Sequence, residues 1–297
     1  MKKRVLAATV LLIIVFMSSS CFNSERQQER IKEMFESFPV AEEKYVLITS
    51  DFVFVGDKQI LRSDLKFEGE KCRHLACLEE GMYAYTYVSG TDNASANILL
   101  IPYDTLLPEL VVTITVDTYI TGVHYRDGGL YFRVKGSESE DPNVGRCLIY
   151  DIKTGKTRTE IYEDVVQIDK GIYNNRSKLY SVTRNIDSFS NYYEVTEKAS
   201  GKTKQITKDV LKSCEEGKAI LKKGKLKTAI TTIQPVYEKD GAIYLFSNML
   251  DDGVLGYPNH CFILKYDFES ENADFYTWVY CEDYQKVVDF YIPQNIN

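Results

Sequence analysis

Histidine and tryptophan are scarce in this chain, with three histidines and one tryptophan in 297 residues. The sequence also has no G-x-S-x-G elbow, no H-E-x-x-H motif, no P-loop and no G-x-G-x-x-G turn. It therefore lacks the usual signatures of serine hydrolases, zinc peptidases and nucleotide-binding enzymes. His74, His124 and His260 are the few candidates for a histidine-based acid or base. We predict no catalytic residue, no metal and no cofactor, and a binding protein rather than an enzyme.

Positive charge is also in short supply, because 36 Lys and Arg side chains are outnumbered by 43 Asp and Glu, for a formal net charge of −7. Binding to nucleic acid depends on clustered basic side chains that neutralise phosphates. The one basic cluster, residues 222–227, is interpreted as a solvated hairpin turn. We therefore exclude nucleic acid as a partner.

Long apolar runs are rare as well, and the clearest one is Val5–Met17, which follows Lys2, Lys3 and Arg4. A run of this length rises only about 20 Å as a helix, less than the roughly 30 Å hydrocarbon core of a bilayer. A basic start followed by a short apolar run is typical of an export signal rather than a membrane-spanning anchor.

Three small residues, Ser18 to Ser20, stand directly before Cys21. This arrangement resembles the lipobox of bacterial lipoproteins, although Ser18 occupies a position where that family usually has an aliphatic residue. The resemblance implies that residues 1–20 are a signal peptide and that Cys21 is diacylated, becomes the mature N-terminus and anchors the protein to a membrane. The protein would then lie on the extracytoplasmic face, at the cell surface or in the periplasm depending on the envelope. A plainly cleaved secreted form and an uncleaved anchor are the alternatives.

Residues 21–40 are predicted to form a tether with a short amphipathic helix. Its apolar side chains recur at spacings of three and four, which is a helical period, and Pro39 ends the run. These side chains are Ile31, Met34, Phe35 and Phe38. We expect this stripe to pack on the first sheet of the following domain. Contact with the lipid interface or with a partner protein is the alternative.

What the chain has in quantity is aromatic residues, 12% of the total, which favours half-buried sheets. The segment Gly128–Thr157 shows the repeating unit most clearly. Leu130, Phe132 and Val134 recur with the period of two that marks a strand. A glycine turn precedes this strand, and Lys153–Lys156 is a second turn signal, so the segment is predicted to be a meander of antiparallel strands.

Similar strands recur along the chain at spacings of about 48, 49 and 64 residues, at Tyr83, Tyr131, Tyr180 and Tyr244. Repeats of 40 to 50 residues with about four strands each are typical of propeller blades. The pattern, with the turn Tyr150–Lys156 as its clearest motif, resembles bacterial β-propeller proteins. It implies an all-β fold over residues 41–297, a β-propeller of about five to seven four-stranded blades. The last strand, residues 287–292, is expected to close the ring beside an N-terminal strand such as residues 45–49.

Long polar loops lie between the second and third strands of the repeats, and in such blades they gather on one rim. We predict that this rim binds a ligand. The candidate ligand-binding residues bring carboxylates, an amide, an aromatic ring and a titratable imidazole: Asp92, Asn93, Glu138, Glu140, Asp141, Asp187, Asp251, Asp252, Tyr257 and His260. No loop matches the D-x-[DN]-x-[DN]-G pattern of calcium sites.

These patterns favour a lipid-anchored, exported β-propeller that acts as a binding or scaffolding module at the cell envelope. Its ligand would be a protein, a peptide or a glycan. The alternative is an envelope hydrolase or lyase that acts on carbohydrate or peptide and carries its carboxylates on the long-loop rim.

Two further features are open in the sequence. Six cysteines besides Cys21 allow up to three disulfides in 15 connectivities, and Cys147 and Cys261 fit buried core positions equally well. Residues 208–235 interrupt the repeat. They are either an insertion or a decayed blade with strands at residues 219–222 and 227–233.

Overall fold

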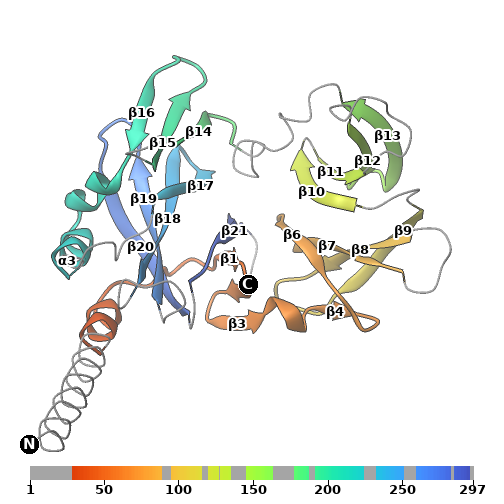
Figure 1. The fold of residues 1–297 in the computed structure, drawn as a ribbon, viewed down its shortest axis with the longest axis horizontal. Coiled ribbons are helices and arrows are strands. Elements are labelled where there is room, and N and C mark those ends of the chain that lie inside the picture. The colour runs from red at the N-terminus through yellow and green to blue at the C-terminus, as the bar shows by residue number, and fades with distance from the viewer. Residues whose placement is uncertain are drawn as a thin grey trace, which may run out of the picture.

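The computed structural model describes residues 29–88, 95–115, 120–126, 128–134, 145–162, 177–186, 191–223, 232–250, 259–281 and 284–294. These residues form an all-β protein built of several small antiparallel sheets (Figure 1). No helix in the described part of the chain is both long enough and apolar enough to cross a bilayer.

The described strands form five larger sheets and one short hairpin. Four sheets have four strands, in the orders β21(Val287–Tyr291)–β1(Val46–Thr49)–β2(Phe52–Val55)–β3(Lys58–Leu61), β6(Arg73–Cys77)–β7(Met82–Tyr87)–β8(Ser95–Ile101)–β9(Glu109–Thr115), β10(Ile120–Arg126)–β11(Gly129–Val134)–β12(Gly145–Asp151)–β13(Lys156–Tyr162) and β17(Gln234–Lys239)–β18(Ala242–Leu250)–β19(Asn259–Asp267)–β20(Ala273–Cys281). The fifth has three strands, β14(Tyr180–Ile186)–β15(Asn191–Glu197)–β16(Thr203–Ile206), and the hairpin is β4(Lys66–Phe67)–β5(Glu70–Lys71).

The recurring tyrosines occupy the strands that the sequence predicts. Tyr83, Tyr131, Tyr180 and Tyr244 lie in β7, β11, β14 and β18, and all four side chains are buried. The turn after β12 also forms as expected. The side chain of Asp151 accepts a hydrogen bond of 2.8 Å from the Thr154 amide, and Gly155 takes a positive φ of 66°. Local turn chemistry and alternation thus determine these hairpins.

The sheets stack face to face in a series, and each pair of neighbours encloses an apolar cluster. The cluster between the sheets β14–β16 and β17–β20 includes Leu245 and Phe262, and the opposite face of β17–β20 meets β1 and β21 through Phe246 and Phe290. Two further clusters join the β1 sheet to β6–β9 and then β6–β9 to β10–β13. In Figure 1 the sheets accordingly follow one another along an arc. Burial on both faces explains why β1 is buried at all four positions.

The two ends of the domain meet in one sheet. The last strand, β21, pairs antiparallel with β1, with Leu47 opposite Phe290 and Val46 opposite Tyr291. This pairing confirms the prediction that the C-terminal strand lies beside the segment 45–49. It also buries an edge on each strand that would otherwise be open to other chains.

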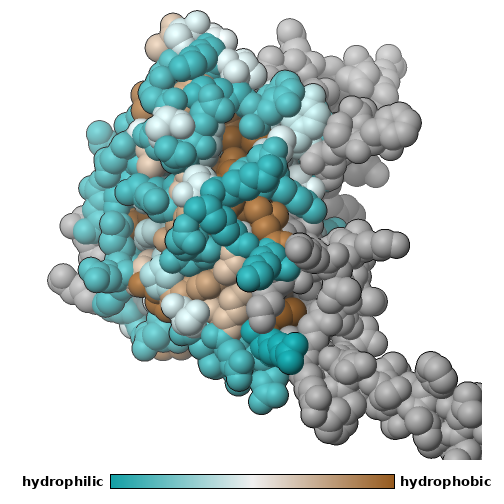
Figure 2. Space-filling model, turned by 90° about the vertical axis from the view of Figure 1, so that its left-hand side faces the viewer, coloured by the Kyte–Doolittle hydropathy of each residue, from teal (hydrophilic) through white to brown (hydrophobic). Residues whose placement is uncertain are grey.

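Helical segments pack at one side of the series, where the surface is largely hydrophilic with apolar atoms between the polar ones (Figure 2). The predicted tether helix is present over residues 29–36, but it packs on the sheet β17–β20 rather than on the first sheet. Its buried side chains, Ile31 and Phe35, lie in the cluster that contains Phe262. The tether therefore contacts a sheet that is distant from it in the sequence.

The interruption at residues 208–235 begins with helices. A 3-10 helix, η3 (Lys208–Ser213), leads into α3 (Glu215–Lys223). The prediction of a strand at residues 219–222 is therefore wrong. Two acidic residues, Glu215 and Glu216, open the first turn of α3, which suits the positive end of the helix dipole. Ile220 is fully buried beside Leu211, so this segment buries its apolar side chains as helices do.

Candidate functional site

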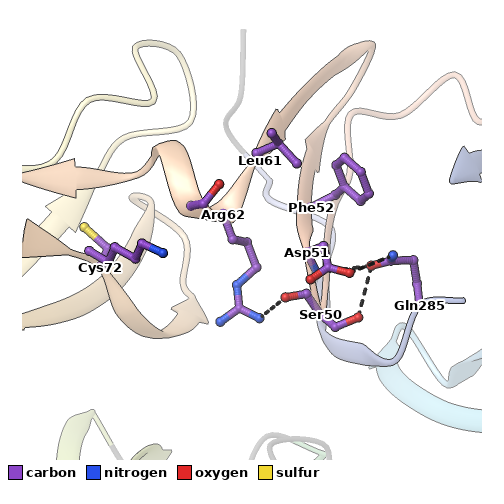
Figure 3. A pocket seen from close by; sticks show the side chains of 9 residues that line it. Ser50, Asp51, Phe52, Leu61, Arg62, Cys72 and Gln285 are labelled. Carbon is purple, nitrogen blue, oxygen red and sulfur yellow. Dashed lines mark hydrogen bonds between the residues drawn. The ribbon is translucent and has the colours of Figure 1, made fainter. Parts of the chain in front are cut away.

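A pocket of about 470 Å³ opens beside the turn that joins β1 and β2 (Figure 3). In the series of sheets, β1 and β2 correspond to the second and third strands of the other four-stranded sheets. Their turn therefore occupies the same end of its sheet as the predicted long loops, and so do the links that lead into β21 and out of β3. The lining residues are Ser50, Asp51, Phe52, Leu61, Arg62, Ser63, Lys71, Cys72 and Gln285. The volume is in the range of small-molecule sites.

Arg62, the first residue of the 3-10 helix η1 (Arg62–Asp64), is fixed to the turn by three hydrogen bonds. Its amide donates to the Asp51 carbonyl at 2.7 Å, and its Nη1 donates to the carbonyls of Thr49 at 3.0 Å and Ser50 at 2.9 Å. In the described part of the chain, its Nε and Nη2 have no hydrogen-bond partner. Burial lowers the pKa of Arg62, and the Asp51 carboxylate opposes this effect. The site thus holds a half-buried guanidinium of fixed orientation, and its Nε and Nη2 donors are available to a ligand.

Gln285 holds the turn from the other side. Its Oε1 accepts hydrogen bonds from the Thr49 hydroxyl at 2.7 Å, the Ser50 hydroxyl at 3.1 Å and the Asp51 amide at 3.1 Å. Its Nε2 donates to the Asp51 carboxylate at 3.1 Å. The side chain is fully buried, and its main-chain carbonyl accepts from Asn248 Nδ2 at 3.0 Å. We call Gln285 with these partners the Gln285 clamp.

The remaining chemistry of the pocket favours binding over reaction. Burial raises the pKa of the Cys72 thiol to about 11, so the thiol is protonated at neutral pH and is a weak nucleophile. Lys71 is exposed at the mouth and adds a second positive charge, whereas Asp51 contributes one negative charge. Leu61 and Phe52 supply apolar wall. Such a lining suits a small ligand that carries an anionic group.

His260 does not lie on a solvent-facing rim. Its side chain is fully buried in β19, where its ring stacks on Phe35 with centroids 4.3 Å apart and an interplanar angle of 3°. Trp278 and Tyr280 lie beside it, at centroid distances of 5.5 Å and 5.4 Å. The structure therefore assigns His260 to the packing of the tether helix on the sheet, in place of the exposed role that the sequence predicts.

The other predicted binding residues lie outside the described residues: Asp92, Asn93, Glu138, Glu140, Asp141, Asp187, Asp251, Asp252 and Tyr257. Cys21 and the signal peptide lie outside them as well. Their roles stay predictions, and so does the envelope hydrolase that would use these carboxylates. Among the described residues, no group of three or more His, Cys, Asp or Glu side chains could hold a metal ion.

Sequence reasoning missed Arg62 and Gln285. β1 and β2 are joined by Ser50 and Asp51 alone, whereas the other repeats have long polar loops between their second and third strands. That shortening is the signal that could have drawn attention to this end of the sheet. No local pattern indicates Gln285, because the turn residues that its side chain contacts are more than 230 residues away in the chain.

No family model and no curated protein matches the chain. Several solved structures resemble it distantly. TolB from Acinetobacter baumannii is 10% identical, with a TM-score of 0.33, and the match covers 80% of this chain and 54% of TolB, so the chain spans about half of TolB's length. A proposed 6-phosphogluconolactonase from Bacteroides fragilis is 9% identical, with a TM-score of 0.28, and the match covers 80% and 82% of the two chains. At these values neither likeness bears on function.

Proposed function

We propose that this protein is an exported, lipid-anchored β-propeller that acts as a binding module at the cell envelope. Support for the propeller comes from the five sheets stacked in series and from the β21–β1 pairing, which joins the two ends of the domain. We propose that these five sheets are five blades, the lower limit of the predicted range. Support for the anchor is the sequence that precedes and includes Cys21.

The orientation of Arg62 carries the binding function. Two main-chain carbonyls fix its Nη1, which leaves Nε and Nη2 to donate to a ligand without loss of side-chain freedom on binding. A planar carboxylate matches this pair of donors, and such hydrogen bonds are stronger than neutral ones. We propose that the pocket holds the carboxylate of a small ligand, a peptide terminus or an acidic glycan, with Lys71 assisting at the mouth.

The experiment compares N-acetylglycine, which carries a carboxylate, with N-acetylglycinamide, its neutral counterpart. Isothermal titration of the full-length protein in detergent is expected to show at least about tenfold tighter binding of the carboxylate. Arg62→Gln should abolish this preference. Arg62→Lys should retain only part of it, because an ammonium lacks the planar fork. Equal binding of both probes, or binding that survives Arg62→Gln, would contradict the proposal.

A matched pair of lysine variants tests the mouth of the pocket. Lys71→Gln is expected to weaken binding of the carboxylate about threefold, since an exposed charge contributes only a few tenths of a kcal/mol to about 1 kcal/mol. Lys66 lies in β4, is also exposed and does not line the pocket. Lys66→Gln removes the same charge and should leave the affinity unchanged.

The anchor is tested separately. In cells that express the Cys21→Ala variant, we expect the unprocessed precursor to accumulate in place of the processed, membrane-retained protein. Normal processing together with unchanged retention in the membrane fraction would exclude lipidation while leaving the pocket proposal standing.

A further inference from the structure

Two buried cysteines meet behind the pocket. Cys261 in β19 and Cys281 at the end of β20 are both fully buried, and their Sγ atoms are 3.6 Å apart. Both side chains lie in the apolar cluster between the sheet β17–β20 and the strands β1 and β21. Neither of the two forms a disulfide in the structure.

Contacts lead from this pair to the Gln285 clamp by two routes. The Cys261 thiol donates to Asn248 Oδ1 at 3.0 Å, and Asn248 Nδ2 donates to the Gln285 carbonyl at 3.0 Å. Cys281, for its part, lies only four residues before Gln285 in the chain. Gln285 in turn holds the Thr49 and Asp51 groups of the pocket turn. A change at the sulfur atoms therefore has both a hydrogen-bonded and a covalent path to the pocket.

We propose that Cys261 and Cys281 form a reversible disulfide that sets the Gln285 clamp and, through it, the shape of the pocket. This disulfide is one of the pairings that the six cysteines allow. It does not depend on which ligand the pocket takes.

The reaction is an exchange with a small-molecule disulfide such as glutathione disulfide. One cysteine thiolate attacks the donor and releases one donor thiol, and the second cysteine then attacks the mixed disulfide and releases the other. Two electrons and two protons pass from the protein thiols to the sulfurs of the donor. Burial raises the pKa of Cys261, so the intact fold reacts slowly, and the exchange proceeds during folding or when the end of β20 opens.

The register of the strands makes this bond reversible. Cys261 lies opposite Val279 and Cys281 lies opposite Asn259, so the cysteines are diagonal neighbours rather than direct partners. Diagonal positions in a sheet are farther apart than an unstrained disulfide prefers, and a strained disulfide is more easily reduced. Closing the bond pulls Cys281 toward Cys261 and removes the thiol donor of Asn248. Both changes loosen the clamp.

The test begins with the unfolded, reduced full-length protein, refolded in either reduced or oxidised glutathione. After alkylation, trypsin cleaves at Lys265, between the two cysteines, so a disulfide joins the peptides 240–265 and 266–286. We expect this cross-linked peptide only from the oxidised sample. Hydrogen exchange of the Asp51 amide, which donates to Gln285, should be at least about tenfold faster in the oxidised protein. Exchange in β7 should be the same in both.

Two variants provide the controls. Cys214→Ser changes a half-buried cysteine near α3 and should leave both the cross-link and the exchange response intact. Cys281→Ala should remove both. Absence of the cross-linked peptide after oxidative refolding, or its replacement by a different pairing, would overturn the disulfide. A cross-link without any change in Asp51 exchange would overturn the coupling to the pocket.

Discussion

The β18–β19 hairpin and the β1–β2 hairpin occupy equivalent places in their sheets but differ greatly in length. Each strand of β18–β19 has nine residues and the connection spans residues 251–258, whereas β1 and β2 have four residues each and are joined by Ser50 and Asp51 alone. Both hairpins are buried on two faces. The difference shows that shortening a hairpin need not weaken its core. It opens the end of the sheet, and the pocket lies there.

The largest effect on stability is expected where β21 packs on the sheet β17–β20. Phe290 in β21 is fully buried against Tyr45 and Tyr244. Phe290→Ala should lower the free energy of unfolding by about 3–5 kcal/mol, because it removes a ring and leaves a cavity. Tyr280→Ala, at a position that is 44% exposed, should lower it by less than about 1 kcal/mol. Denaturant unfolding measures both. Similar losses for the two variants would mean that β21 does not join the sheets.

A smaller effect is expected from the clamp. Gln285→Ala leaves the Asp51 amide and the Thr49 hydroxyl without their buried acceptor, which should cost about 1–3 kcal/mol of stability. Gln59→Ala, at an exposed position in β3, should change stability by less than about 0.5 kcal/mol. If the two variants unfold at the same denaturant concentration, the clamp does not hold the turn.

The smallest effect concerns the reactivity of Cys72, and it leaves stability untouched. With a pKa near 11 in the folded protein and about 8.5 in an unfolded chain, the Cys72 thiol stays protonated through pH 8 to 10 only while the pocket is folded. Its rate of alkylation by iodoacetamide should therefore rise steeply between pH 9 and 11, read by mass spectrometry of the peptide. In the urea-unfolded protein the rise should be centred about two pH units lower. Coincident profiles would mean that the pocket does not bury Cys72.

The hairpins were predictable from the sequence because their signals are local. An aromatic strand after a glycine turn, with the alternation of Leu130 and Phe132, is enough to indicate β11, and the same pattern indicates β7 and β18. The strand β14 follows a polar turn instead and is indicated by its spacing in the repeat. The pairing of β21 with β1 was predictable for a related reason, since residues 287–292 form a strand-like run that follows the four strands β17–β20. The helices η3 and α3 of the insertion were not predictable, because each buries few side chains and these lie close together in the sequence.

The site was not predictable in the same way. Arg62 is oriented by main-chain carbonyls, which leave no trace in the choice of side chains, and Ser50 and Gln285 are 235 residues apart. For His260 the sequence did hold the information. His260, Phe262 and Leu264 are spaced two residues apart and therefore share one face of β19, the face on which the tether packs. This spacing is a stronger indication of burial than the nearby long loop is of exposure.

The central claim is that the short β1–β2 hairpin presents Arg62 to an anionic ligand. The measurement that tests it most directly is the Nε–Hε NMR signal of Arg62, assigned by its loss in Arg62→Lys, during titration with N-acetylglycine. The account predicts a saturable shift of this signal with the carboxylate and none with N-acetylglycinamide. A signal that does not move with the carboxylate, or moves equally with both compounds, would contradict it.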